Sequence, residues 1–265
     1  MRSLAGQCAL ITGAGRGIGK ALALRLAAEG AHVTLTARTH AQIEAVAAEI
    51  ASRGGQALAV AADVTDEAAV YHVATAAAER FGPVAVLINN AGIGDPFGPI
   101  GDIDPLQWWA TQKVHVLGSL LFMRSVIPAM RARGGGRIIN IVSRAGLQPI
   151  HNMSAYAVAK CTAIRLIEQV DLEEREHKIR AFALQPGTII TEMAQQTLSS
   201  PEAQRYIPEG IAMLRALTSA SSDADLQRCC DVVAALAAGT YDALAGQYLD
   251  IAWDLEARLA SLAIS

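Results

Sequence analysis

Residues 8–30 read CALITGAGRGIGKALALRLAAEG and join a short apolar run to a segment with helical spacing. The apolar run is typical of a buried strand, and the helical segment closes on Gly30, a residue type that often ends helices. Between them, Gly13 allows a sharp turn. Gly17 and Gly19 remove side chains where a backbone must approach a ligand or pack against a strand. The stretch therefore predicts a strand, a tight turn and a helix in direct succession.

The glycine turn has the properties of a phosphate-binding loop. The N-terminus of the following helix offers free N–H groups and the positive end of a dipole to a pyrophosphate. The spacing over residues 13–19 is G-x-x-x-G-x-G, which differs from the common G-x-G-x-x-G fingerprint. Most glycine clusters are only turns, but this one lies between the first strand and the first helix of an alternating chain. We therefore interpret it as a dinucleotide site.

Strand-like and helix-like segments alternate along the rest of the chain. Long segments with helical spacing, such as residues 39–55 and 66–82, separate short apolar runs, several of them rich in Val and Ile. This alternation predicts an α/β fold with one doubly wound, Rossmann-type parallel sheet of seven strands, flanked by helices on both faces. We expect residues 1–265 to form a single dinucleotide-binding and catalytic domain. The expected strands lie at 8–12, 32–37, 57–62, 84–89, 137–142, 179–184 and 246–251.

The overall composition argues against several function classes. Of the 265 residues, 52% are hydrophobic and 18% are charged, and the formal net charge is −3. No basic stripe is present that would bind nucleic acid. The sequence shows no secretory signal and no apolar run long enough to cross a bilayer, so we expect a cytoplasmic protein without a membrane partner. The four cysteines lack a CxxC pair, which favours reduced thiols, and the histidines do not fall at ligand spacing, so no metal site is expected.

The charge at the end of the second expected strand bears on the choice of cofactor. An acidic residue at this point would bind the ribose hydroxyls of NAD, but the strand ends in Ala37 and Arg38. Arg16, inside the glycine turn, is expected on the same side of the fold. Two arginines can pair with a 2′-phosphate, although both can also be ordinary surface residues. We favour NADP(H) over NAD(H).

Tyr156 and Lys160 lie four positions apart in the stretch SAYAVAKC, on one face of an expected helix. A free phenol has a pKa of about 10, and a nearby ammonium lowers it, so the pair can exchange a proton with an alcohol oxygen. Ser143 ends the fifth expected strand, where ligands bind in open parallel sheets. The stretch INNAG, residues 88–92, ends the fourth strand beside the switch point of such a sheet. The alternative is an ordinary surface contact between the tyrosine and the lysine.

Together these motifs resemble a known enzyme family. From about Gly6 to Asp250 the chain is similar to the smaller, single-domain short-chain dehydrogenases/reductases. Each matching piece is modest alone, and their order and spacing carry the resemblance. The pieces are TGAGRGIG (12–19), ADV (62–64), NNAG (89–92), Ser143, YAVAK (156–160) and PGTIIT (186–191).

The resemblance implies a role for each matching residue. Tyr156 would be the general acid/base, Lys160 would lower its pKa and bind the nicotinamide ribose, and Ser143 would orient the substrate carbonyl. Tyr156 and Lys160 would therefore also contact the cofactor. The glycine turn and the end of the second strand would contribute cofactor contacts from Gly13, Arg16, Gly17, Ile18, Gly19 and Arg38. Asp63 and Val64 would contact the adenine, and the end of the fourth strand would contribute Asn90, Ala91 and Gly92. The loop at the nicotinamide carboxamide and pyrophosphate would contribute Pro186, Gly187, Ile189 and Thr191.

The sequence departs from the family pattern at His115. The family usually carries a catalytic asparagine at this position, which helps hold a water that relays protons to the lysine. A neutral imidazole can accept one hydrogen bond and donate another, and histidine can also titrate in the working pH range. The alternative is that the backbone carbonyl serves the relay and the side chain only packs. We keep His115 as a candidate catalytic residue, with both interpretations open.

Two segments lie outside the alternating pattern. Residues from about 188 to 222 contain Pro201, Pro208 and polar clusters, and we predict a substrate-lid insertion there. From about 254 to 265 the chain departs from the usual ending of the family. Leucines at helical spacing predict a helical extension in this segment. The extension would cover the protein's own core or the sheet edge, contact a neighbouring subunit, or shape the substrate pocket.

We therefore expect an NADP(H)-dependent carbonyl reductase or secondary-alcohol dehydrogenase. It would move a hydride between nicotinamide and a mostly apolar small-molecule ketone or alcohol. By resemblance, it would form a homodimer or homotetramer through long helices at about 106–133 and 154–178. One alternative is a dinucleotide-binding sensor or scaffold with weak or no turnover. A weaker alternative is an epimerase or dehydratase that uses the same Tyr/Lys pair with a permanently bound dinucleotide.

Overall fold

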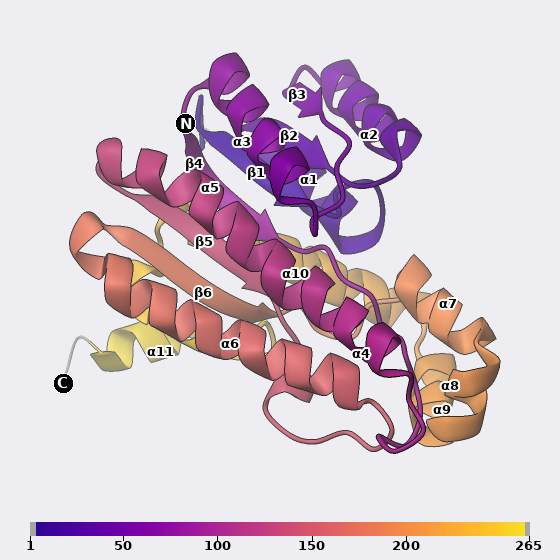
Figure 1. The fold of residues 1–265 in the computed structure, drawn as a ribbon. Coiled ribbons are helices and arrows are strands. Elements are labelled where there is room, and N and C mark those ends of the chain that lie inside the picture. The colour runs from indigo at the N-terminus through magenta and orange to yellow at the C-terminus, as the bar shows by residue number, and fades with distance from the viewer. Residues whose placement is uncertain (1–3, 263–265) are drawn as a thin grey trace.

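The computed structural model describes residues 4–262, and a single parallel sheet lies at their centre (Figure 1). Its strand order is β3-β2-β1-β4-β5-β6-β7, and every pairing is parallel. This order confirms the predicted α/β, Rossmann-type fold class. Among the described residues the seven strands are β1 (Cys8–Thr12), β2 (His32–Thr36), β3 (Gln56–Ala59), β4 (Val84–Asn89), β5 (Gly136–Ile141), β6 (Ile179–Gln185) and β7 (Tyr248–Asp250).

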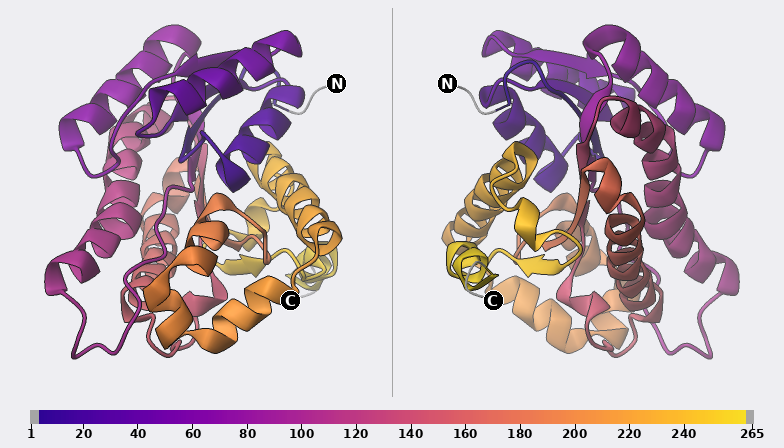
Figure 2. Two further views of the ribbon diagram at one scale, coloured as in Figure 1. Left: turned by 90° about the vertical axis from the view of Figure 1, so that its right-hand side faces the viewer. Right: turned by 90° about the vertical axis from the view of Figure 1, so that its left-hand side faces the viewer.

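Helices cover both faces of the sheet, as Figure 2 shows. One face is covered by α3 (Glu67–Phe81), α5 (Gly118–Ala132) and α6 (Ser154–Glu174), and the other by α1 (Gly17–Ala28), α2 (His40–Ser52) and α10 (Ser219–Ala238). The strands between them are buried on both faces, which explains their continuous apolar runs. In β1, side chains alternate between the faces, so Leu10 packs with the first set of helices and Ile11 with the second.

Two strands are more than one residue shorter than their apolar runs predict. β3 ends at Ala59 instead of residue 62, because beyond this point the chain leaves the sheet edge and keeps only the backbone bonds from Val60 to Leu35 and from Ala62 to Ala37. β7 covers only Tyr248–Asp250 instead of residues 246–251. Gly246 has φ of +77°, so the chain is still turning at this point and cannot be extended.

The helix expected at 106–133 is divided into three parts. α4 (Pro105–Gln112) leads through a π-helical segment (Lys113–Leu117) into α5. Such π-helical turns are common at functional sites, and His115 lies within this one. By length and composition alone, the stretch Pro105–Ala132 could cross a membrane, because an 18-residue window within it has a mean hydropathy of 1.2, which the sequence had not led us to expect. In the fold this stretch packs against α3, α6 and β4.

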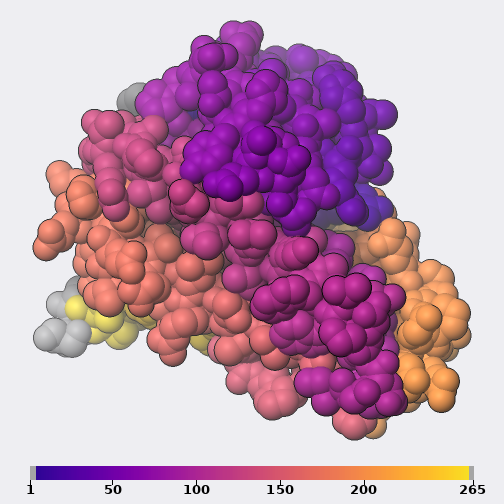
Figure 3. All heavy atoms as spheres, viewed as in Figure 1, coloured from indigo at the N-terminus to yellow at the C-terminus, as the bar shows by residue number. Residues whose placement is uncertain are grey.

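The segment that breaks the alternation forms three short helices, α7 (Glu192–Ser199), α8 (Pro201–Tyr206) and α9 (Pro208–Ala216). Pro201 and Pro208 each open a helix, a position where the missing N–H has no cost. Figures 1 and 3 show these helices, coloured orange, at one end of the molecule close to α4. After β7 the chain forms α11 (Leu255–Leu262), and the end of the expected extension, residues 263–265, lies outside the described residues.

Candidate active site

A cleft of about 300 Å³ lies where the central strands end. It brings together fourteen of the residues singled out in the sequence: Gly13, Arg16, Gly17, Ile18, Arg38, Asp63, Val64, Asn90, Ala91, Gly92, Tyr156, Lys160, Pro186 and Thr191. Five other predicted site residues do not line the cleft themselves but lie next to these residues in the chain or in the fold: Gly19, His115, Ser143, Gly187 and Ile189. Within residues 4–262, no group of three or more His, Cys, Asp or Glu side chains is arranged to hold a metal ion.

The glycine turn at the mouth of the cleft depends on three positions. Gly13 and Gly17 have φ of +63° and +52°, a region that side chains other than glycine rarely adopt. Gly19 lies beneath the turn, where an added Cβ would fall 2.2 Å from the carbonyl oxygen of Gly13. Gly19 thus lets α1 pack against the turn, while the other two shape the backbone that faces the cleft.

Asn90 and Thr12 join the ends of β4 and β1. The Thr12 hydroxyl oxygen accepts the backbone N–H groups of Asn90 at 2.9 Å and Ala91 at 3.0 Å. In return, the Asn90 amide donates to the carbonyl oxygens of Thr12 at 3.0 Å and Gly13 at 3.2 Å. Asn90 therefore holds the glycine turn in place, which is a structural task in addition to the cofactor contact that the resemblance implies.

The two arginines predicted to select the cofactor line the same cleft, together with Thr39 and Gln42. Within residues 4–262, the guanidinium groups of Arg16 and Arg38 make no hydrogen bond and no ion pair. Burial raises the pKa of Asp63, but hydrogen bonds from Thr65 and the charge of Arg38 outweigh it, so that the pKa is lowered. Both guanidinium groups are thus available to an anionic ligand.

Lys160 is buried, and its ammonium donates a hydrogen bond of 2.8 Å to the carbonyl oxygen of Ile141. Burial lowers the pKa of Lys160 to about 7. Its Nζ lies 5.5 Å from the centre of the Tyr156 ring. Burial raises the pKa of Tyr156, and the Ser143 hydroxyl lowers it in part. The pKa of Tyr156 is thus raised overall, because burial disfavours the charged phenolate, and the lowering of this pKa by Lys160 stays a prediction.

Ser143 follows β5 and lies beside the phenol. Its hydroxyl oxygen accepts the backbone N–H of Ala145 at 3.2 Å, which fixes the start of the next turn. The neighbouring Arg144 instead forms an ion pair of 2.9 Å with the buried carboxylate of Asp250. Ser143 therefore lies within reach of the Tyr156 phenol, while Arg144 ties the end of β5 to β7.

His115 is almost completely buried, and its imidazole contacts the loop that follows β4. Its Nε2 lies 2.8 Å from the carbonyl oxygen and 3.2 Å from the backbone nitrogen of Ile93. The shorter contact is satisfied by the tautomer that carries a proton on Nε2. An added Cβ on Gly92 would fall 2.5 Å from the imidazole, so this glycine makes room for the ring.

Burial, together with the nearby charge of Lys160, lowers the pKa of His115 to about 3. The expectation that this histidine titrates in the working pH range is therefore wrong, since it stays neutral. Its own carbonyl oxygen accepts a hydrogen bond of 2.8 Å from the Ser119 hydroxyl. The side chain does more than pack, because it binds the Ile93 backbone directly.

Several cleft residues were not selected from the sequence. Gln42 lines the cleft and belongs to no recognised motif, although it lies against Gly15 of the glycine turn. Glu192 follows the PGTIIT stretch and lines the cleft, with a carboxylate oxygen 3.3 Å from where a Cβ on Gly17 would lie. Only proximity to the recognised motifs would have pointed to these residues.

A second cavity of about 610 Å³ adjoins the cleft and shares Met193 with it. It lies between the loop after β4 and the helices α7 and α8. Apolar side chains such as Phe97 and Tyr206 form part of its wall. Four acidic residues also line it: Asp95, Asp102, Asp104 and Glu202.

Comparison with known proteins adds independent findings. A family model described as short chain dehydrogenase matches residues 7–202. Levodione reductase from Leifsonia aquatica is 35% identical over 204 residues, which cover 76% of this chain and 76% of that protein.

Solved structures show the same similarity in three dimensions. A structure of 7α-hydroxysteroid dehydrogenase complexed with NADH and 7-oxo glycochenodeoxycholic acid superimposes with a TM-score of 0.81 at 31% identity, covering 93% of each chain. A metagenomic short-chain oxidoreductase in complex with NADP gives a TM-score of 0.72 at 34% identity, covering 89% of this chain and 92% of that one. The two relatives were therefore crystallised with different dinucleotides.

Proposed function

The chain belongs to the short-chain dehydrogenase family, as its motifs indicated, and on this premise we propose that it is an NADP(H)-dependent carbonyl reductase or secondary-alcohol dehydrogenase. It is an oxidoreductase that acts on CH–OH and C=O groups. The observation that carries the proposal is one cleft that holds the glycine turn, the two unpaired arginines and the Tyr156/Lys160 pair. The dinucleotide would lie along this cleft, with its nicotinamide end at Tyr156.

In the direction of ketone reduction, Tyr156 donates its hydroxyl proton to the oxygen that becomes the alcohol. Its raised pKa keeps the phenol protonated at neutral pH, as a proton donor must be. Ser143 hydrogen-bonds the same substrate oxygen and holds the carbonyl in line with the phenol. When bound, the reduced nicotinamide supplies the hydride that adds to the carbonyl carbon.

Lys160 acts after the proton has left the phenol. With a pKa of about 7 it is roughly half protonated at neutral pH. As an ammonium, it stabilises the phenolate on Tyr156 by its charge. The hydrogen bond to Ile141 fixes the ammonium next to the ring and keeps it inside the cleft.

The preference for NADP(H) is supported by charge at the adenosine end of the cleft. Arg16 and Arg38 both face the cleft and have no competing ion pair in residues 4–262. A 2′-phosphate would satisfy both guanidinium groups, while a 2′-hydroxyl would leave them unpaired. Because the solved relatives contain NADH in one case and NADP in the other, the preference rests on the arginines of this chain.

The substrate would enter through the cavity that adjoins the cleft at Met193, with α7 and α8 as its lid. Phe97 and Tyr206 support the expectation of an apolar ketone or alcohol. The acidic side chains add a selection by charge that the sequence did not reveal. No Lys or Arg of the described chain lines this cavity, so their negative charge is not balanced there. We infer a neutral or cationic substrate, since a carboxylate would be repelled.

The proposed assembly follows from the family expectation. Exposed apolar side chains on α4 and α6, such as Trp109 and Leu172, support a homodimer or homotetramer formed through these helices. Light scattering after size exclusion tests this, and a monomer at micromolar concentration would contradict it. We propose a cytoplasmic protein, which fractionation of the native cells would test.

Turnover is the direct test of the function. The protein is mixed with NADPH, and separately with NADH, over a panel of aromatic, aliphatic and cyclic ketones, and the loss of reduced-nicotinamide absorbance is followed. We expect turnover with NADPH that is lost in Tyr156→Phe. Binding of NADPH without turnover over the whole panel would instead favour the dinucleotide sensor or scaffold.

A further inference from the structure

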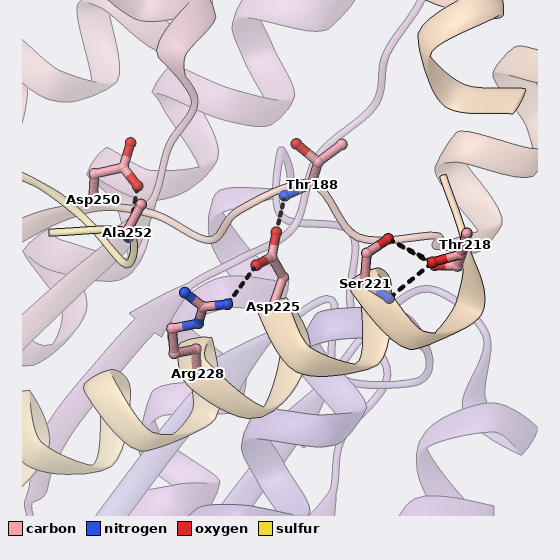
Figure 4. A network of polar contacts seen from close by, with 7 residues as sticks. All are labelled: Thr188, Thr218, Ser221, Asp225, Arg228, Asp250 and Ala252. Atoms are coloured by element: carbon pink, nitrogen blue, oxygen red, sulfur yellow. Dashed lines mark hydrogen bonds and ion pairs between the residues drawn. The ribbon is translucent and has the colours of Figure 1, made fainter. Parts of the chain in front are cut away.

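The loop between β6 and α7 is held by two side chains from α10, a helix that follows it by about thirty residues. The Asp225 carboxylate accepts the backbone N–H of Thr188 at 2.9 Å, as Figure 4 shows. The Ser222 hydroxyl accepts the backbone N–H of Ile190 at 2.8 Å. Ser222 and Asp225 are three positions apart and so share one face of α10. We refer to these two residues as the α10 anchor.

The anchor approaches the loop very closely. Gly187 has φ of +86°, and an added Cβ there would fall 2.6 Å from the Asp225 carboxylate. The glycine thus serves two purposes, since it permits the left-handed backbone and leaves space for the carboxylate. The contact is part of the shape of the loop and is not an incidental surface bond.

The anchor occupies alternate N–H groups of the loop and leaves the others free. Thr188 and Ile190 donate to α10, whereas the backbone N–H groups of Ile189 and Thr191 have no partner within residues 4–262. Thr191 itself lines the cleft. The loop therefore presents unpaired donors next to the site proposed for the nicotinamide end of the cofactor.

The helix that carries the α10 anchor is itself held by a cap at its start and by packing in the core. The hydroxyl of Thr218 caps α10 by accepting the backbone N–H of Ser221 at 3.1 Å (Figure 4). Further along, Cys229 and Val233 are buried in the core against α1 and the sheet. Arg228 lies 3.5 Å from the free oxygen of Asp225, but such an exposed ion pair contributes little.

We propose that Ser222 and Asp225 are positioning residues, which hold the loop of residues 186–191 so that its free N–H groups meet the nicotinamide half of the dinucleotide. The inference rests on the proposed function, because it assumes a dinucleotide in the cleft. Neither residue lines the cleft or the adjoining cavity. Their effect is transmitted by the backbone of Thr188 and Ile190, and it is confined to the nicotinamide end.

The experiment compares two ligands that differ only in the nicotinamide. Calorimetry measures the affinities for NADP⁺ and for 2′-phospho-ADP-ribose, which lacks that ring, with NAD⁺ and ADP-ribose titrated in parallel in case the 2′-phosphate is not preferred. The variants are Asp225→Ala, Asp225→Asn and Ser222→Ala. Asp223→Ala is the matched control, because Asp223 is an exposed residue on the same helix.

We expect Asp225→Ala and Ser222→Ala to weaken binding of the complete dinucleotide by roughly tenfold, the effect of one hydrogen bond to a backbone N–H. Affinity for the fragment stays within about twofold, because the adenosine end is untouched. Asp225→Asn restores most of the loss, since its amide oxygen still accepts from Thr188. The affinity for the fragment also reports whether each variant is folded.

Three results would overturn the inference. If both alanine variants bind the dinucleotide as tightly as the wild-type protein, Ser222 and Asp225 are not positioning residues, and the proposed function is unaffected. An equal loss for dinucleotide and fragment shows a general structural role instead of a positioning one. If the wild-type protein binds none of the four ligands, the proposed function fails, and the anchor fails with it.

Discussion

The imidazole of His115 packs edge-on against the phenol ring of Tyr156, with ring centres 5.5 Å apart and an interplanar angle of 86°. The same imidazole binds the backbone of Ile93 through Nε2. A single buried side chain therefore connects the π-helical segment, the loop after β4 and the proposed catalytic tyrosine. Because it stays neutral, it can fix the orientation of the ring without adding charge to the site.

Replacing His115 with asparagine should reduce the acid sensitivity of folding. The pKa of His115 is lowered from 6.5 to about 3, so between these values the unfolded chain binds a proton that the folded protein does not. Stability contributed by this group is therefore present above pH 6.5 and lost on acidification, by at most about 1.4 kcal/mol per pH unit. Urea unfolding at about pH 4 and about pH 6.5 measures this loss. Equal pH dependence in wild type and His115→Asn would show that the imidazole does not cause it.

Tyr156→Phe should abolish most turnover without removing cofactor binding. Loss of the proton donor should lower kcat by about 10²- to 10⁴-fold. The phenylalanine ring keeps the contact with His115, so the dinucleotide dissociation constant should change by less than about twofold. Steady-state kinetics and a binding titration measure both quantities, with the exposed Tyr71→Phe on α3 as the control. A variant that retains full kcat would remove Tyr156 from the mechanism.

Lys160 should make the protein more stable as the pH rises above neutrality. Its pKa is lowered from 10.5 to about 7, so between these values the unfolded state binds more protons than the folded state. The cost of burying the ammonium is therefore full below pH 7 and disappears towards pH 10.5, by at most about 1.4 kcal/mol per pH unit. Between about pH 7 and about pH 9, denaturant unfolding should show the free energy of unfolding of the wild-type protein rising relative to that of Lys160→Met. A constant difference between the two proteins would contradict the depressed pKa.

Arg16→Ala and Arg38→Ala should each reduce the preference for NADPH. A charge-assisted hydrogen bond to a phosphate contributes about 1.5 to 3 kcal/mol, so kcat/KM with NADPH should fall by roughly 10- to 100-fold. Values with NADH should change by less than about twofold, because NADH lacks the 2′-phosphate. Arg53→Ala, at the far end of α2, is the control. Parallel losses with both cofactors would show that the arginines do not read the 2′-phosphate.

The acidic wall of the substrate cavity should discriminate between charged ketones. Of two ketones matched in size, one with an amine and one with a carboxylate, the first should have the higher kcat/KM. The difference should decrease at high salt, which screens exposed charges. Asp102→Asn and Glu202→Gln should reduce it as well, since both side chains line the cavity. A carboxylate substrate that reacts as well as its amine partner would refute this selection.

The alternation of apolar runs and helical segments was sufficient to predict the sheet and its flanking helices. Central strands such as β1 and β4 are buried on both faces, so their hydrophobic signal is continuous and strong. Strand boundaries were less certain, because the end of β3 depends on where the chain leaves the sheet edge and the start of β7 depends on the turn at Gly246. Local sequence does not report either event.

The positions of the candidate site were also largely visible in the sequence. Ligands of an open parallel sheet bind at the carboxyl ends of its strands, so motifs at strand ends must meet in one cleft. The properties of the groups were harder to predict. Tyr156 and Lys160 share a helix face, yet their pKa values are governed by burial, which depends on how α4, the π-helical segment and the sheet pack against α6.

The sequence by itself determined the order of strands and helices, the glycine turn and the residues that meet in the cleft, because these depend on local patterns of polarity and backbone freedom. Tertiary structure alone decided that His115 is neutral and bound to Ile93, and that Asp225 holds the N–H of Thr188. It also decided that acidic side chains from two distant segments line one cavity. The physical reason is that burial and long-range contact arise only when the chain is packed, and they set the charge state and the position of each group.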